Sequence, residues 1–178
     1  RRAETLAAAG WPPVPYLGEG ITPYEMRLTM SVKPLRVGIV GLGGISRLMH
    51  LPNASQSPLT DLVAVCDIVA EKAETTAWYT DPNEMFRQAP LDAVIIATPN
   101  RTHTDLYVAA LEAGLHVLAE KPIALNGEDA SRILNTATAS GRLFMADFQE
   151  RFWPESMLLK RFIEAGELGQ IYYAEAAW

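Results

Sequence analysis

Lys121 has the clearest chemical signal in this sequence. It lies between Glu120 and Pro122, directly after an apolar segment over 116–119 that predicts a buried strand. Lysine is seldom placed beside a core without a partner or a function. Its amine could hydrogen-bond a substrate hydroxyl and move the hydroxyl proton during hydride transfer, so Lys121 is the candidate catalytic residue. A salt-bridged surface lysine is the alternative interpretation.

A glycine-rich turn is the candidate phosphate-binding site. It follows an apolar segment over 35–40 and opens a helix; Gly41 would allow a tight turn, and Gly43 would let the backbone approach a pyrophosphate. Ser46 takes the third position, where a small residue lets helix and strand pack closely. Free N–H groups and the dipole at the helix start favour an anion. An ordinary glycine turn is the alternative. The candidate cofactor-binding residues of the turn are Gly41, Leu42, Gly43, Gly44, Ile45 and Ser46.

Asp67 is the candidate ribose ligand. It follows the second predicted strand, where a carboxylate can accept hydrogen bonds from a ribose 2′-hydroxyl and would repel a 2′-phosphate. Ile68 and Val69 bring no cation, which favours NAD over NADP as the cofactor. The spacing of 26 residues from Gly41 exceeds the usual ~20, and a loop over 52–58 accounts for the excess. A helix cap is the alternative role of this aspartate.

The residues after a third apolar segment, over 93–97, should lie at the same ligand-binding edge of the sheet. Pro99, between Thr98 and Asn100, would provide a rigid apolar wall for a ring. His103 would lie close by, in the first turn of the next helix. Helix capping by Asn100 is an equally good interpretation.

His50, His116 and Cys66 are interpreted as structural residues. His50 ends a predicted helix, and His116 opens a predicted strand. Cys66 lies within an apolar strand, where a free cysteine behaves as a small core residue. Because it is the only cysteine, a disulfide framework is excluded, and a reduced, cytoplasmic setting is expected.

The composition limits the expected partners. The chain of 178 residues has a net charge of −6 and no basic run, so nucleic acid is not an expected partner. No apolar run approaches the ~18 residues that suggest a membrane span, and no metal site is expected. The length suits one full domain and part of another.

The elements that must position these side chains alternate between strand and helix signals, which predicts an α/β fold with a Rossmann-type, doubly wound parallel sheet. Six strands are expected in the sheet, and five of them are located, over 35–40, 61–66, 93–97, 116–119 and 143–146. Helices are expected from about Gly44 to before Pro52, with a loop over 53–58, and then over 69–77, 82–88, 102–113, 126–140 and 155–165, with Asp81 and Asn126 as N-caps.

Three regions are expected along the chain. Glycines and prolines interrupt any periodicity over 1–33, which predicts an irregular N-terminal extension. Residues 34–148 are expected to form the dinucleotide-binding domain. The part over 149–178 holds an aromatic connector, a helix and a strand over 170–178. Since a strand needs neighbours, this part is interpreted as the incomplete start of a second, α+β domain.

The ordered motifs resemble the Gfo/Idh/MocA family (glucose–fructose oxidoreductase, inositol dehydrogenase, rhizopine catabolism). The resemblance rests on the glycine turn, Cys66-Asp67, 97–100 and 113–122, and it extends from about Val37 to Trp178. It implies a dinucleotide domain followed by a domain with an open sheet, and NAD(P)-dependent oxidation or reduction of a sugar or cyclitol carbon.

The resemblance also implies residue roles. The glycine turn and Asp67 would hold the adenosine half of the cofactor, and a second group, Thr98, Pro99, Asn100 and His103, would line the path to the nicotinamide. Glu120 and Lys121 would lie by the nicotinamide and substrate, with Lys121 as the catalytic lysine and a cis bond before Pro122. Arg151 corresponds to an arginine that faces cofactor or substrate, although Glu150 beside it departs from the family pattern. A further catalytic aspartate and histidine are expected beyond residue 178.

Three functions remain open at this point. The first is a sugar or polyol dehydrogenase, represented here by its N-terminal part. The second is a glycoside hydrolase of the same family that retains NAD, and the third is a non-catalytic regulator that senses a dinucleotide or a sugar. The complete protein is expected to be a homo-oligomer.

Overall fold

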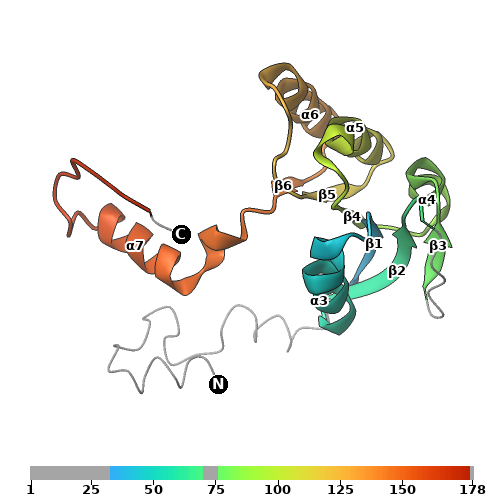
Figure 1. Cartoon of the computed structure of the whole chain (residues 1–178), viewed down its shortest axis with the longest axis horizontal. Helices are drawn as coiled ribbons and strands as arrows, with labels where there is room; N and C mark the ends of the chain where they lie inside the picture. Colours follow the sequence, from blue (N-terminus) through green and yellow to red (C-terminus); the bar gives the residue numbers. More distant parts are fainter. Residues whose placement is uncertain (1–32, 70–75, 177–178) are drawn as a thin grey trace.

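The computed structural model describes residues 33–69 and 76–176, so nearly all of the predicted N-terminal extension lies outside the described residues (Figure 1). The strands are β1 (Leu35–Val40), β2 (Thr60–Cys66), β3 (Ala77–Tyr79), β4 (Ala93–Ile96), β5 (His116–Ala119) and β6 (Phe144–Ala146). The α-helices are α3 (Leu51–Gln56), α4 (Pro82–Gln88), α5 (His103–Glu112), α6 (Gly127–Ser140) and α7 (Pro154–Glu164). Shorter segments are the π-helical η1 (Ser46–His50) and the 3-10 turns η2 (Asn100–Thr102) and η3 (Gln149–Phe152).

The six strands form one parallel sheet in the order β3-β2-β1-β4-β5-β6. This confirms the predicted doubly wound α/β fold. The strand order changes direction between β1 and β4, which is the switch point where such sheets bind ligands. Because the strands are parallel, their carboxyl ends share one edge. Gly41, Asp67, Glu120 and Asp147 directly follow β1, β2, β5 and β6, so the sheet brings them to that edge.

Helices cover the two faces of the sheet unequally. On one face, Ile96 of β4 and Val117 of β5 are buried in a cluster with Leu111 of α5 and Ile133 of α6. On the other face α3 lies over β1 and β2 (Figure 1), and the cluster beneath it consists of Ile39, Leu42, Ala54 and Val65. On this second face a groove lies beside α3, and part of the candidate site lines it.

Two predicted helix caps are confirmed. The Asp81 side chain accepts a hydrogen bond from the Asn83 N–H at 2.9 Å at the start of α4. The Asn126 side chain accepts one from the Asp129 N–H at 2.8 Å at the start of α6. These local signals depend on residues two or three positions apart, so the sequence alone identifies them.

The helix after the glycine turn does not end before Pro52, and this prediction was wrong. Helical structure continues through α3 to Gln56, so most of the loop predicted over 53–58 is helical. Pro52 lies in the first turn of α3, where a missing N–H removes no α-helical hydrogen bond. The π-helical η1 directly precedes α3, so the proline falls at the start of a new α-helical segment.

Two further element predictions were wrong in their described parts. A helix was expected over 69–77, yet Ala77 begins β3, whose residues pair with Ala64 to Cys66 of β2; residues 70–75 lie outside the described residues. Aromatic side chains at Trp78 and Tyr79 favour this strand. A strand was expected over 170–178, but 170–176 has no strand and is exposed, because no described strand lies beside it.

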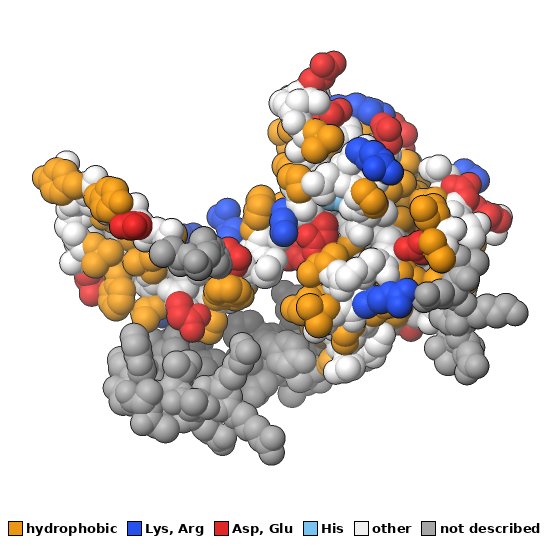
Figure 2. All heavy atoms as spheres, in the orientation of Figure 1, with side chains coloured by type: hydrophobic (Ala, Val, Ile, Leu, Met, Phe, Trp, Pro, Cys, Tyr) orange, Lys and Arg blue, Asp and Glu red, His pale blue; other side chains and the backbone are white. Residues whose placement is uncertain are grey.

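The last helix lies apart from the sheet. A connector that contains η3 joins β6 to α7, and Figure 2 shows hydrophobic side chains gathered on the arm that carries α7. No residue of α7 is buried, and its exposed apolar side chains are Met157, Leu159, Phe162 and Ile163. Among the described residues, no helix has the length and apolar character needed to cross a membrane.

Candidate active site

The glycine turn has a conformation that requires glycine at its first position. Gly41 has a φ of +87°, and a Cβ added there would lie 2.5 Å from the Ala97 carbonyl oxygen. The Gly41 N–H donates to the Cys66 carbonyl oxygen at 2.8 Å, which ties the turn to the end of β2. The turn therefore lies tightly against two neighbouring strands, as the sequence predicted.

The outer side of the same turn is open. A Cβ added to Gly43 or Gly44 would meet no atom within 4 Å, so this space can admit a ligand close to the backbone. The first N–H groups of a helix have no intrahelical partners and are suited to binding an anion. The open turn followed by a helix therefore fits the phosphates of a dinucleotide.

Ser46 and Arg47 hold the turn from the helix side. The Ser46 side chain is fully buried, and its hydroxyl donates a hydrogen bond to the Gly41 carbonyl oxygen. Arg47 Nε donates to the Leu42 carbonyl oxygen at 2.8 Å. Ser46 therefore acts on the shape of the turn, while Arg47, which the sequence did not single out, places a cation beside it.

Asp67 lies against the glycine turn. Its Oδ2 accepts a hydrogen bond from the Leu42 N–H at 2.7 Å, and its Oδ1 accepts one from the Val69 N–H at 2.9 Å. The second contact is local capping, and the first joins the ends of β1 and β2. Because each carboxylate oxygen has two lone pairs, both retain the capacity to accept a ribose hydroxyl.

His103 is positioned differently from Thr98, Pro99 and Asn100. Pro99 and Asn100 are exposed at the end of β4, whereas His103 is 1% exposed. Its Nε2 lies 2.8 Å from the Thr98 carbonyl oxygen and its Nδ1 lies 2.7 Å from the Pro122 carbonyl oxygen. The buried His103 therefore links the segment after β4 to the segment after β5.

Lys121 and Glu120, at the end of β5, differ in exposure and in their contacts. Lys121 is exposed and, within the described part of the chain, forms no ion pair. Glu120 is 7% exposed; its Oε2 accepts a hydrogen bond from the Lys121 backbone N–H at 3.1 Å, and its carbonyl oxygen accepts one from the Tyr107 hydroxyl at 2.9 Å. The bond between Lys121 and Pro122 is cis, as the family resemblance implied.

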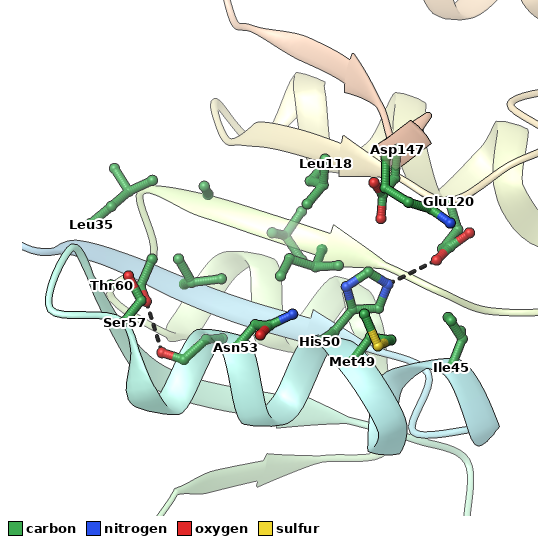
Figure 3. A pocket seen from close by; sticks show the side chains of 16 residues that line it. Leu35, Ile45, Met49, His50, Asn53, Ser57, Thr60, Leu118, Glu120 and Asp147 are labelled. Atoms are coloured by element: carbon green, nitrogen blue, oxygen red, sulfur yellow. Dashed lines mark hydrogen bonds and ion pairs between the residues drawn. The ribbon is translucent and has the colours of Figure 1, made fainter. Parts of the chain in front are cut away.

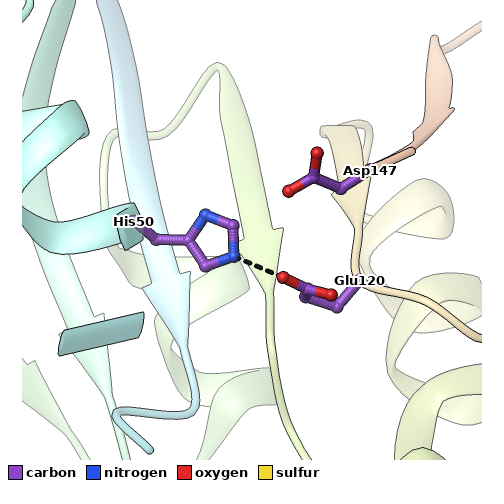
Figure 4. Close-up of side chains that lie close together, drawn as sticks. All are labelled: His50, Glu120 and Asp147. Carbon is purple, nitrogen blue, oxygen red and sulfur yellow. Dashed lines mark hydrogen bonds and ion pairs between the residues drawn. The ribbon is translucent and has the colours of Figure 1, made fainter. Parts of the chain in front are cut away.

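Glu120 also belongs to a cluster that the sequence did not predict. Its Oε1 lies 2.9 Å from His50 Nε2, and Asp147 points toward the pair from the end of β6 (Figure 4). One ligand atom from each of the three side chains lies within 4.8 Å of the others. His50 was interpreted as structural and Asp147 was not singled out; the signal for Asp147 was its place directly after a strand.

The cluster lies between two cavities. The groove beside α3 has a volume of about 470 Å³ and is lined in part by Met49, His50, Asn53, Glu120 and Asp147 (Figure 3). A second cavity, also of about 470 Å³, is lined by Lys121, Asp147, Phe148, Gln149, Glu150 and Arg151. Asp147 lines both cavities, and Arg151 of η3 shares the second one with Lys121.

The environment of Asp147 favours its protonated form. Burial raises the pKa of the Asp147 carboxyl above its ordinary value, and the Glu120 carboxylate raises it further, while His50 acts in the opposite direction. The site thus combines an exposed lysine with a carboxyl group whose pKa is raised.

The sheet, the glycine turn at the switch point and the aspartate after β2 define a dinucleotide-binding domain of the Rossmann class. Residues 35–148 match the family described as an oxidoreductase family with an NAD-binding Rossmann fold. This chain belongs to that family, the Gfo/Idh/MocA oxidoreductases. The family, the fold and NAD as its cofactor are therefore confirmed.

Curated relatives are dehydrogenases. The chain is 39% identical over 153 residues to inositol 2-dehydrogenase 4 of Saccharopolyspora erythraea, covering 79% of this chain and 44% of that enzyme. It is 35% identical over 158 residues to D-glucoside 3-dehydrogenase of Escherichia coli K12, covering 85% of this chain and 45% of that enzyme. The chain therefore spans somewhat under half the length of the curated relatives it matches.

Solved structures agree with this assignment. The apo scyllo-inositol dehydrogenase from Lactobacillus casei has a TM-score of 0.73 at 28% identity, covering 79% of this chain and 44% of that chain. The same enzyme with bound NAD(H) and scyllo-inositol gives 0.72 at 28% identity, covering 77% and 43%. The WlbA dehydrogenase from Bordetella pertussis, in complex with NADH and UDP-GlcNAcA, gives 0.73 at 31% identity, covering 79% and 45%.

Proposed function

We propose that this chain is the cofactor-binding part of an NAD-dependent dehydrogenase that acts on a hydroxyl-bearing carbon of a sugar or a cyclitol. The observation that carries the proposal is the shared sheet edge: the open glycine turn, Asp67 and the exposed Lys121 all follow parallel strands of one sheet. The names of the relatives, inositol and glucoside dehydrogenases, support the substrate class.

The residues divide into two groups along the edge. We assign the adenosine half of the cofactor to the glycine turn, Gly41 to Ser46, and to Asp67, whose charge favours NAD over NADP. We assign the nicotinamide half to Thr98, Pro99, Asn100, Glu120 and Arg151. His103 supports that half through the carbonyl groups of Thr98 and Pro122, which its ring nitrogens contact.

Lys121 is the proposed catalytic residue. When bound, the nicotinamide cofactor supplies the hydride acceptor or donor. Lys121 Nζ hydrogen-bonds the substrate hydroxyl, orients it and accepts its proton as the carbon is oxidised; in the reverse direction it returns the proton to the carbonyl oxygen. Its exposure to the cavity that Arg151 also lines supports contact with a substrate entering there.

The dehydrogenase is preferred over the two alternatives because the curated relatives named above carry out net oxidation or reduction according to their names. We further propose that 34–148 is the dinucleotide domain and that 149–178 begins a second domain. We also propose that the protein is cytoplasmic and that the complete protein is a homo-oligomer.

Titration of this chain with NADH and NADPH, followed by energy transfer from tryptophan, tests the cofactor assignment. Trp78 of β3 pairs across from Val65 of β2, in the strand that ends at Asp67, and serves as a donor near the adenosine side. We expect NADH to bind more tightly than NADPH. Tighter binding of NADPH would contradict the role of Asp67, and absence of binding by either cofactor would contradict the cofactor assignment.

A further inference from the structure

His50, Glu120 and Asp147 come from three different elements and meet at one place. His50 ends η1, Glu120 follows β5, and Asp147 follows β6 (Figure 4). The neighbouring strands hold the two acids in register, because the Glu120 N–H donates to Ile96 and the Asp147 N–H donates to the Ala119 carbonyl oxygen at 2.8 Å. The sheet thus fixes the two acids, and His50 reaches them from η1.

The cluster has more negative than positive charge. Glu120 and His50 are 7% and 6% exposed and contact each other, so one imidazole faces two carboxyl groups. The other charged groups at the second cavity are Lys121, Glu150 and Arg151, which line it with Asp147. Two neighbouring carboxyl groups, Glu120 buried and Asp147 half-buried, disfavour ionisation of both at once.

Asp147 connects this cluster to the proposed reaction site. It lines the groove that contains His50 and Glu120, and it also lines the cavity that contains Lys121. A proton on the cluster can therefore exchange with the cavity where Lys121 would meet a substrate hydroxyl.

We propose that Asp147, held beside His50 and Glu120, exchanges a proton with solvent according to the oxidation state of the bound nicotinamide cofactor. This rests on the proposed function, which assigns the nicotinamide half to the end of β5. An oxidised nicotinamide ring is a cation and a reduced ring is neutral, and a nearby cation favours the ionised form of a carboxyl group. Binding of NAD⁺ therefore favours loss of a proton from Asp147 to solvent, relative to binding of NADH.

The same link joins proton transfer to hydride transfer. When the substrate carbon is oxidised, the positive charge on the ring disappears, and the cluster's affinity for a proton rises. Lys121 takes the hydroxyl proton, and Asp147 takes up a proton from solvent once the cofactor is reduced. The O–H bond of the substrate breaks, an N–H bond on Lys121 forms, and the hydride carries both electrons of the C–H bond.

The test is isothermal titration calorimetry of this chain with NAD⁺ and with NADH, in buffers of different ionisation enthalpy, at several pH values between about 4.5 and 7. The dependence of the binding enthalpy on the buffer gives the number of protons released. We expect NAD⁺ to release up to roughly one proton more than NADH at the pH where Asp147 titrates.

Variants separate this link from a general effect of binding. Asp147→Asn should abolish the difference between the two cofactors, and Glu120→Gln should reduce it. Asp105→Asn is the matched control, because Asp105 is exposed, pairs with Arg132 of α6 and lines neither cavity. It should leave the difference unchanged.

Two failures are distinguishable. If both cofactors bind and release equal numbers of protons, the proton link is wrong and the cofactor assignment stands. If neither cofactor binds, the cofactor assignment is wrong and the proton link fails with it. An unchanged difference in Asp147→Asn would also overturn the link.

Discussion

The Asp67 carboxylate accepts a hydrogen bond from the Leu42 backbone N–H at 2.7 Å, so the proposed ribose ligand also supports the phosphate-binding turn. Asp67→Asn keeps an oxygen acceptor at this position and removes the charge. We expect the preference for NADH over NADPH to fall by roughly tenfold to a hundredfold, because a charged hydrogen bond contributes about 1.5–3 kcal/mol. Fluorescence titration with both cofactors measures the ratio.

Asp61→Asn is the control for the Asp67 variant, because Asp61 is exposed on the same strand, β2. It should leave the ratio of the two affinities unchanged. A ratio that stays the same in Asp67→Asn would remove Asp67 from cofactor selection, whatever happens to the absolute affinities.

Variants at Gly41 and Gly43 distinguish an effect on folding from an effect on cofactor binding. Gly41→Ala should lower the free energy of unfolding by about 2 kcal/mol or more, because the residue has a positive φ and the added Cβ would lie 2.5 Å from the Ala97 carbonyl oxygen. Gly43→Ala should change it by less than about 0.5 kcal/mol, since its Cβ meets nothing within 4 Å. Urea unfolding measures both.

Gly43→Ala is expected to impair cofactor binding although it leaves the stability of the fold nearly unchanged. Gly43→Ala should weaken NADH binding by at least about tenfold, because the methyl group occupies the space that a pyrophosphate would approach, and tenfold corresponds to about 1.4 kcal/mol. Unchanged NADH affinity in a folded Gly43→Ala variant would place the phosphates elsewhere.

Local signals in the sequence predicted much of this fold. Apolar segments located five of the six strands, and Asp81 and Asn126 identified two helix starts correctly. Predictions failed where tertiary pairing decided the structure. Ala77 joins a short strand because β2 supplies a partner for it, and 170–176 forms no strand because no strand among the described residues pairs with it.

The candidate site likewise has a part that the sequence could predict and a part that it could not. Gly41 and Asp67 each follow a strand, so the parallel sheet places them at one edge without further information. The contact between His50 and Glu120 could not be predicted in this way, because it joins residues 70 positions apart and depends on how η1 crosses the end of β5. A helix-ending histidine by itself gives no sign of such a partner.

Asp147→Asn should stabilise the fold near neutral pH. The pKa of Asp147 is raised in the folded state, chiefly by burial. The ionised carboxylate is therefore less favourable in the folded chain than in the unfolded chain. A raised carboxyl pKa contributes stability below the unfolded value, and that contribution is lost as pH rises through the folded value. Removing the ionisable group should therefore raise the Tm by about 1–3 °C near pH 7.

The gain should vanish below about pH 3, where Asp147 is largely protonated in both states. Differential scanning fluorimetry across this range measures it, with Asp105→Asn as the exposed control. A gain that is equal at all pH values would show that the effect is not due to the charge of Asp147.

Cys66 should be inert in the folded chain. Burial raises the pKa of its thiol to about 12, and the nearby Asp67 and Asp81 carboxylates act in the same direction. Because the thiolate is the reactive form, iodoacetamide at about pH 8 should leave the native chain largely unlabelled and should label it fully in urea. Mass spectrometry gives an unambiguous answer, since Cys66 is the only cysteine. Rapid labelling of the native chain would contradict its placement in the core.

Lys121→Ala tests the proposed reaction itself. In a form of the protein with measurable sugar or cyclitol oxidation, kcat should fall by ~10² or more, because positioned proton transfer contributes about that much. NADH affinity, measured on this chain, should change little, since the proposed role of Lys121 is toward the substrate hydroxyl. Lys160→Ala is the matched control: Lys160 is an exposed lysine on α7 that pairs with Glu164, and both kcat and NADH affinity should stay unchanged. An unchanged kcat in Lys121→Ala would remove the lysine from the mechanism and would favour a protein that binds the cofactor without using it.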